Sequence, residues 1–305
     1  MKIANAPCSW GVLEFESTAL APSADQVLDE IAATGYAGTE LGDWGFLGTD
    51  AGQLQLDLGR RHLALVGAFV AIPLTDRSAH DPGAATAVRT ARLLAAANNT
   101  EPPVVVLSDA TAAAAERTAK AGRITAADRL PAAAWEIVAS GADRIARAVH
   151  DATGLRTVFH HHCATYVETP EEIDALLERT DPDLVGLCID TGHATYGGGD
   201  PVDLLSRYAG RVRHVHFKDC SASIAGQARA GHWDYLQAIR RGLFCELGQG
   251  QVDFGAVLAR LQTIDYKGWI VVEQDVLPAM ITASTSGTPA ASAQRNRQFL
   301  RRLGV

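Results

Sequence analysis

The chain has 305 residues, of which 47% are hydrophobic and 20% charged, and its formal net charge is -8. The negative charge argues against a nucleic acid or an anionic membrane as the main partner, because both are bound best by a basic face. A small uncharged substrate is easier to accommodate.

Short apolar, β-branched runs alternate with longer helical patterns along the whole sequence. The pattern predicts eight strands and eight helices. The strands are expected at residues 3–7, 38–41, 63–72, 104–107, 156–162, 185–190, 212–217 and 269–273. The helices are expected at residues 25–34, 52–62, 84–98, 126–153, 170–180, 201–208, 254–264 and 291–303. Strands that alternate with helices in this way indicate a closed parallel sheet. We predict an α/β protein with a single (β/α)8 TIM barrel domain over residues 1–305.

Two connections are longer than simple turns between a strand and a helix. They follow the fourth and seventh strands, at residues 108–125 and 219–253, and the second contains a helical pattern near residues 232–241. Both leave the C-terminal ends of strands, where barrel enzymes build their sites, so they are candidates for loops that cover a substrate. Residues 8–14, after the first strand, lack a Gly-rich phosphate-binding spacing, and we expect no nucleotide cofactor.

The first residues and the cysteines indicate where the protein works. Residues 1–7 lack the apolar segment of a signal peptide, and no later run is long enough for a membrane-spanning helix. The five cysteines are odd in number and widely spaced, which indicates neither a disulfide framework nor a cysteine zinc site. We predict a cytoplasmic protein with no membrane partner, and we leave open whether it forms a homo-oligomer.

Four apolar strands in the second half of the chain run into a charged or imidazole side chain. These residues are His160, Asp190, His216 and Glu273. A polar residue is tolerated in a strand buried on both faces only where the strand reaches an open end. Each residue alone has a simpler explanation, and Asp190 in particular resembles a helix cap. Together, at the ends of strands five to eight, they predict a site for one divalent metal ion.

Strand alternation sorts the neighbouring histidines. Residues two apart share a face, so His160 and His162 point the same way, with His162 nearer the mouth. By the same argument Lys218 lies nearer the mouth than His216. Imidazole and carboxylate ligands suit Mn, Co, Fe, Ni or Zn better than Ca or Mg, although Mg stays open. Such a metal would act as a Lewis acid on a substrate carbonyl, with proton transfer at the neighbouring carbon by a nearby base.

Five further residues are candidates for contacts with the substrate. Lys218 is long enough to hold a substrate oxygen, or else it pairs with the adjacent aspartate. His193 either orients substrate or supports the metal site from outside. Glu40 ends the second strand and faces the mouth, or it caps the following turn. Trp10 and Trp44 either wall the apolar side of the pocket or pack in the core.

The segments that carry these residues resemble the xylose-isomerase-like TIM barrel superfamily of sugar isomerases and epimerases. Within it they are most similar to the inosose dehydratase branch, which acts in inositol breakdown. The resemblance spans nearly the whole chain. It is carried by residues 5–11, 39–42, 121–123, 160–165, 168–172, 190–193, 214–219, 247–254 and 272–275.

The resemblance implies a metal held by Glu, Asp, His and Glu at the ends of strands five to eight. The last three fall on Asp190, His216 and Glu273, but the first falls on His160, and His162 matches a substrate-side histidine. Epimerases of the superfamily use the two glutamates as a facing acid and base. Because one of that pair is absent, epimerisation by two carboxylates is put in doubt.

A dehydration needs a base beside a ketone and an acid at the leaving hydroxyl, and histidine suits the acid role near neutral pH. Glu273, His162 and Lys218 are the candidates for these roles. Our leading hypothesis is a metal-dependent lyase that dehydrates a small polyhydroxy carbonyl substrate, a cyclic keto-polyol such as an inosose. The alternative is an isomerase or epimerase of a keto-sugar or keto-inositol. More remote alternatives are a metal-dependent endonuclease acting at abasic DNA sites and a non-catalytic binding barrel.

Overall fold

The computed structural model describes residues 1–13, 22–98, 100–111, 114–277 and 287–305. Within these ranges eight parallel strands close into a barrel in the order β1-β10-β7-β6-β5-β4-β3-β2. The strands are β1 (Lys2–Asn5), β2 (Gly38–Glu40), β3 (Ala64–Ile72), β4 (Val104–Asp109), β5 (Arg156–His160), β6 (Val185–Asp190), β7 (Val212–Phe217) and β10 (Trp269–Val272). The predicted (β/α)8 barrel is confirmed.

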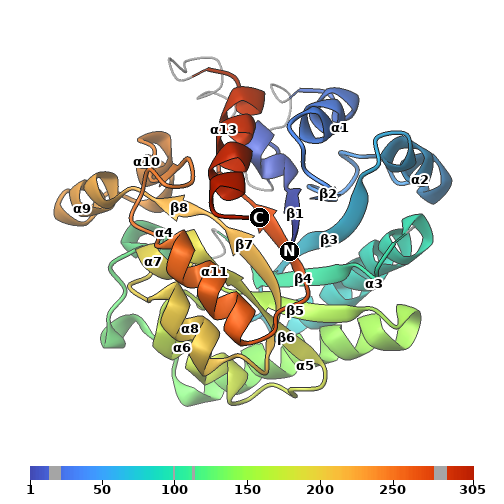
Figure 1. Ribbon diagram of the computed structural model, residues 1–305. Coiled ribbons are helices and arrows are strands. Elements are labelled where there is room, and N and C mark those ends of the chain that lie inside the picture. The colour runs from blue at the N-terminus through green and yellow to red at the C-terminus, as the bar shows by residue number, and fades with distance from the viewer. Residues whose placement is uncertain (14–21, 99, 112–113, 278–286) are drawn as a thin grey trace.

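An outer ring of helices surrounds the strands (Figure 1). Its members are α1 (Ala24–Ala33), α2 (Ala51–Gly59), α3 (His80–Ala97), α5 (Ala132–Thr153), α6 (Pro170–Leu177), α8 (Pro201–Arg207), α11 (Phe254–Thr263) and α13 (Pro289–Arg302). Side-chain caps start several of them. At the start of α6, the Thr169 hydroxyl accepts the backbone N–H of Glu172, and the Glu172 carboxylate accepts the backbone N–H of Thr169. Pro170 is the first residue of the helix.

One long helix begins later than the sequence pattern predicts. We expected it to cover residues 126–153, but α5 starts at Ala132, and residues Ala126–Asp128 form a separate 3-10 turn. The reason is Pro131, which has no N–H to donate and keeps the preceding residue out of the helical region. The helix therefore starts on the far side of the proline.

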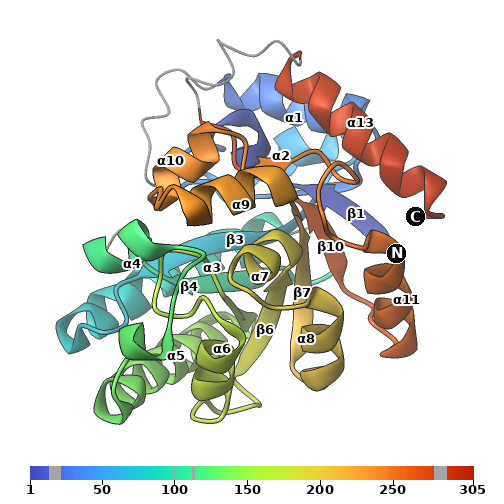
Figure 2. The same cartoon turned by 90° about the vertical axis from the view of Figure 1, so that its left-hand side faces the viewer.

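The first and last strands of the barrel close it. Lys2, Ile3, Ala4 and Asn5 pair with Trp269, Ile270, Val271 and Val272. Both figures of the whole chain show the two termini close together (Figure 1, Figure 2). On the other side of β10, Val271 pairs with His216 of β7, and Asp190 of β6 also pairs with His216. This register brings the ends of β6, β7 and β10 to one level.

Short elements fill the two long connections. Between β4 and α5 lies α4 (Ala115–Lys120); residues 112–113 of this connection lie outside the described residues. Between β7 and α11 lie β8 (Asp219–Cys220), α9 (Ala222–Ala230), α10 (Tyr235–Arg240) and β9 (Phe244–Cys245), where β8 and β9 pair antiparallel. Figure 2 shows α9 and α10 side by side outside the strands. The Asp219 carboxylate anchors this segment by accepting the N–H groups of Gly248, Gly250 and Val252.

An apolar cluster separate from the main core ties both connections to the barrel mouth. It includes Ala121, Cys163, Tyr196, Ala225, Tyr235 and Phe244. Because these side chains come from loops that follow four different strands, their packing fixes the loops relative to one another. None of the described helices combines the length and apolar character that crossing a membrane requires.

Candidate metal centre and substrate pocket

Four side chains gather where β5, β6, β7 and β10 reach the C-terminal end of the barrel. They are His160, Asp190, His216 and Glu273, and one ligand-type atom of each lies within 4.8 Å of the others. All four are at most 9% exposed. Asp190 also caps α7 (Thr191–Tyr196), because its Oδ1 accepts the N–H of His193 at 2.8 Å. The cap uses only one oxygen and leaves the other for the cluster.

The chemistry of this cluster fits a divalent metal ion. His160 Nδ1, Asp190 Oδ2 and His216 Nδ1 are buried and have no hydrogen-bond partner among the described residues. An unpaired buried polar atom costs about 1–3 kcal/mol, and a bound cation would satisfy Asp190 Oδ2 and His216 Nδ1, which face each other at 3.9 Å, with His160 Nε2 3.6 Å from the same Asp190 oxygen. Two imidazoles and two carboxylates suit Mn, Co, Fe or Zn.

Glu40 supports this cluster from behind. Its Oε1 accepts hydrogen bonds from His214 Nε2 at 2.7 Å and His216 Nε2 at 3.0 Å. Because His216 donates from Nε2, its Nδ1 is the nitrogen that faces Asp190 and Glu273, and it would offer its lone pair to an ion once it is deprotonated. Burial raises the pKa of Glu40, but His216 and His214 lower it by a larger amount, so that the pKa falls to about 2. Glu40 thus orients the imidazoles, and no backbone N–H of the part of the chain that the structure describes donates to its carboxylate.

Lys218 lies among three carboxylates. Its Nζ is 2.8 Å from Asp275 Oδ1, 3.2 Å from Glu273 Oε2 and 3.5 Å from Asp190 Oδ2. Burial lowers the pKa of Lys218, but Asp275, Asp190 and Glu273 outweigh it and raise the pKa well above the usual value. The side chain is therefore protonated, and the three carboxylates hold its ammonium group beside the four-residue cluster. Asp219, the partner suggested by sequence, is instead occupied by backbone N–H groups.

The tautomer of His162 is set by its hydrogen bond to the backbone. Its Nδ1 is 2.6 Å from the carbonyl oxygen of Cys163, and because a carbonyl only accepts, Nδ1 must carry the proton. Nε2 lies 3.4 Å from the hydroxyl oxygen of Tyr235, whose single proton is donated either to Nε2 or to Asp275 Oδ2, 3.3 Å away. Burial, together with His160 and Lys218, lowers the pKa of His162 to about 3. The imidazole is therefore neutral, with Nε2 as the acceptor.

A buried ion pair holds the loop that carries His162. The Arg117 guanidinium binds both oxygens of Glu172 at 2.9 and 2.8 Å and donates from Nε to the carbonyl of Thr165 at 2.7 Å. Glu168 accepts the N–H groups of Gly122 and Ala164 at 2.7 and 2.8 Å. Two connections, after β4 and after β5, are thereby joined behind the site.

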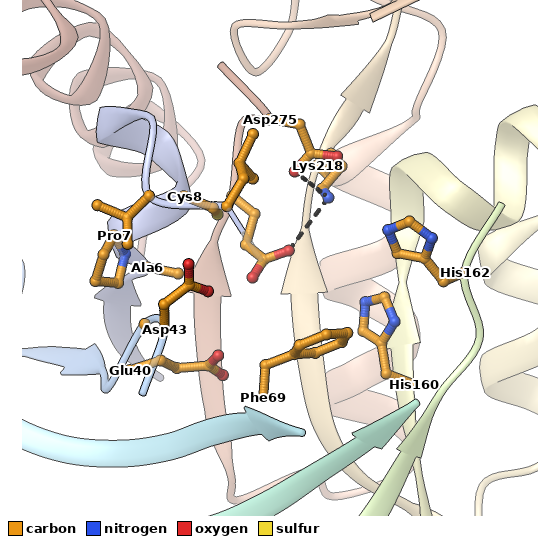
Figure 3. A pocket seen from close by; sticks show the side chains of 14 residues that line it. Ala6, Pro7, Cys8, Glu40, Asp43, Phe69, His160, His162, Lys218 and Asp275 are labelled. Atoms are coloured by element: carbon orange, nitrogen blue, oxygen red, sulfur yellow. Dashed lines mark hydrogen bonds and ion pairs between the residues drawn. The ribbon is translucent and has the colours of Figure 1, made fainter. Parts of the chain in front are cut away.

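The cluster of His160, Asp190, His216 and Glu273 opens into a pocket at the barrel mouth (Figure 3). The hollow encloses about 550 Å³, open solvent included. His160 and His162 lie on one side of it, Ala6, Pro7, Glu40 and Asp43 lie on the other, and Phe69 forms the floor in this view. The lining also includes Cys8, Val12, Leu13, Gly42, Lys218, Glu273 and Asp275.

Three residues proposed from sequence as substrate contacts lie outside this lining. Trp10 is fully buried, and its Nε1 donates to Glu30 Oε2 of α1 at 2.6 Å, so it packs in the core. Trp44 is 41% exposed and stacks under the Arg89 guanidinium at 4.2 Å. His193 is fully buried behind Lys218, with Nε2 3.1 Å from Nζ.

Two residues that line the pocket, and Tyr235 beside them, had no role in the sequence analysis. Asp275 lies two residues past Glu273 and therefore on the same side of the extended chain, a signal that alternation would have found. Tyr235 comes from the insertion after β7, and no local pattern separates it from a core tyrosine. Asp43 follows β2 in a turn, where an aspartate is ordinary.

The fold and the site together define a class: (β/α)8 barrels with an imidazole and carboxylate cluster at the C-terminal mouth. The chain belongs to the family described as Xylose isomerase-like TIM barrel, whose sequence pattern matches residues 28–303.

Named relatives agree with this membership. The inosose dehydratase of Geobacillus kaustophilus (strain HTA426) is 34% identical over 99% of this chain and 94% of its own length. That of Lacticaseibacillus casei is 30% identical over 90% and 89%. A solved structure of a probable 3-DHS dehydratase from Bacillus anthracis superimposes with a TM-score of 0.70 at 15% identity, covering 99% of both chains. This last likeness shows a shared fold.

Proposed function

We propose that this protein is a metal-dependent lyase that removes water from a cyclic keto-polyol such as an inosose. The observation that carries the proposal is the pairing at the end of β5. His160 stands where a catalytic glutamate is expected for epimerisation, and the neutral imidazole of His162 faces the same pocket. The similarity to proteins named inosose dehydratase over nearly the whole chain supports an enzyme of this kind.

In this proposal His160, Asp190, His216 and Glu273 hold one divalent ion, with Mn, Co, Fe or Zn as the candidates and Mg left open. When bound, the ion supplies Lewis acidity that polarises the substrate carbonyl. Glu273 Oε2 already faces His216 and Lys218, each at 3.2 Å, so we assign Glu273 to the metal and not to proton transfer.

His162 is the group we assign to proton transfer. Its Nε2 lone pair accepts the proton from the carbon beside the carbonyl as negative charge develops on the substrate, which offsets the burial that holds the pKa of the free imidazole at about 3, and the resulting imidazolium returns that proton to the leaving hydroxyl on the next carbon. The C–H and C–O bonds break, a C=C bond forms, and one water molecule leaves, so His162 ends as it began. The Lys218 ammonium, held by Asp275, stabilises negative charge on a substrate oxygen.

The test is to incubate the purified chain with Mn²⁺ or Co²⁺ and an inosose in deuterated water. We expect loss of water and a conjugated product that absorbs ultraviolet light, which His162→Gln should abolish while metal content stays unchanged. An isomer labelled with deuterium at one carbon, formed without loss of water, would establish the isomerase or epimerase alternative and refute the lyase.

A further inference from the structure

The carboxylates that line the pocket differ in what they contact. Glu40 binds His214 and His216, and both Glu273 and Asp275 face Lys218. Asp43 differs, because no hydrogen bond or ion pair joins its carboxylate to any of the described residues. It is half-buried, and burial alone raises its pKa. A half-buried carboxylate with no protein partner keeps its capacity to accept hydrogen bonds from a ligand in the pocket.

The chain around Asp43 fixes its direction. Gly42 has a positive φ of 69°, and a Cβ there would approach the Pro7 ring at 3.1 Å, so the loop lies closely against another wall of the pocket. The Asp43 carbonyl accepts the N–H of Phe46 at 3.0 Å, which closes the turn. The next residue, Trp44, is held outward under Arg89. With its neighbours fixed, Asp43 points its carboxylate into the pocket, opposite His160 and His162 (Figure 3).

The charges around the pocket decide which donors fit. Among the described lining residues four carry carboxylates, and Lys218 carries the one ammonium, already paired with Asp275 and Glu273. A phosphate or carboxylate on the substrate would meet the Asp43 charge with no cation on that side among the described lining residues. A hydroxyl group donates to a carboxylate without adding charge.

We infer that Asp43 is a specificity-determining residue that accepts a hydrogen bond from a hydroxyl of an uncharged polyol, on the side of the ring facing away from His162. It selects neutral polyols over their phosphorylated or carboxylated relatives. This inference deepens the proposed function and rests on it for the location of the substrate.

The experiment measures binding, so that it does not depend on turnover. Calorimetric titrations of the Mn²⁺-loaded protein use three probes: myo-inositol, which has no carbonyl to react, myo-inositol 1-phosphate and an amino-inositol. The variants are Asp43→Asn, Asp43→Ala and the control Asp183→Asn, which removes the same charge from an exposed site before β6.

We expect Asp43→Ala to weaken myo-inositol binding roughly 10- to 100-fold, the loss that follows removal of a hydrogen bond to a charged group. Asp43→Asn should weaken it less and should raise the affinity for myo-inositol 1-phosphate relative to myo-inositol. Asp183→Asn should change neither by more than about twofold.

Unchanged myo-inositol binding in both Asp43 variants would overturn the inference, as would a loss confined to the amino-inositol or a wild-type protein that binds no myo-inositol. A wild-type protein that binds myo-inositol through Asp43 but does not dehydrate an inosose would overturn the proposed function and leave the role of Asp43 standing.

Discussion

Removal of Arg117 should strongly destabilise the protein, because Arg117 forms a buried ion pair with Glu172. The side chains of Arg117 and Glu172 are each 1% exposed, and Arg117→Met would leave the Glu172 carboxylate buried without its cation. Loss of one partner from such a pair typically costs about 3–5 kcal/mol. The Thr165 carbonyl would also lose its donor. We expect the free energy of unfolding of Arg117→Met, measured by urea denaturation, to fall by that amount.

Two further variants test the reasoning. Arg117→Met combined with Glu172→Gln removes both charges and keeps an oxygen for the helix cap, so it should recover about 2 kcal/mol or more of the loss. The matched control is Arg207→Met, which breaks an exposed pair with Asp174 and should cost about 1 kcal/mol or less. If Arg117→Met costs no more than Arg207→Met, or if the double variant is as unstable as the sum of its parts, the buried charge is not the cause.

Three other predictions concern the site and its supports. Glu40→Gln should weaken Mn²⁺ binding roughly 10- to 100-fold, because the amide orients His216 less firmly; unchanged affinity in a metal titration would contradict this. Lys218→Met should lower kcat about 100-fold or more while metal content by elemental analysis stays constant, and a change in KM alone would count against charge stabilisation. Burial raises the pKa of Glu168 to about 7, so the folded protein retains a proton that the unfolded chain releases above about pH 4.5. Stability from that proton is present below pH 4.5 and is lost as the pH rises to 7. Glu168→Gln should remove this dependence, by up to about 3 kcal/mol, in unfolding experiments at pH 5 and 8; parallel curves for the two proteins would refute it.

The barrel was predictable because its strands are short, apolar and bounded by clear turn and cap signals. Thr169, with Pro170 and Glu172 behind it, marks the start of α6 in the sequence as plainly as in the structure. The late start of α5 does not follow from periodicity, because an Ala-rich helical pattern runs through Pro131. The proline itself sets the start of the helix. The short helices α4, α7 and α9 were missed since the helical patterns sought were longer.

The site was only partly predictable, because alternation along a strand tells which residues share a face but not which distant residues meet. His160 and His162 both line the pocket, as their spacing indicates. The sequence could not choose between the pocket wall and the core for Trp10, because its partner Glu30 lies on a helix with no sequence relation to it. The same limit hid Tyr235, whose contact with His162 depends on how the β7 insertion folds back. The metal and catalytic assignments stay predictions.

The pairing of β1 with β10 has a consequence for the order of events during synthesis. His160, Asp190 and His216 leave the ribosome on three successive strands, whereas Glu273 follows β10, the last strand of the barrel. Until β10 is inserted, β1 and β7 both have an unpaired edge, and a metal ion would find three of its four protein ligands. In the proposed site, strong metal binding would therefore arise in the same step as barrel closure. A nascent chain that stalls before β10 would expose two unpaired strand edges that are prone to aggregation, and it would bind the ion weakly.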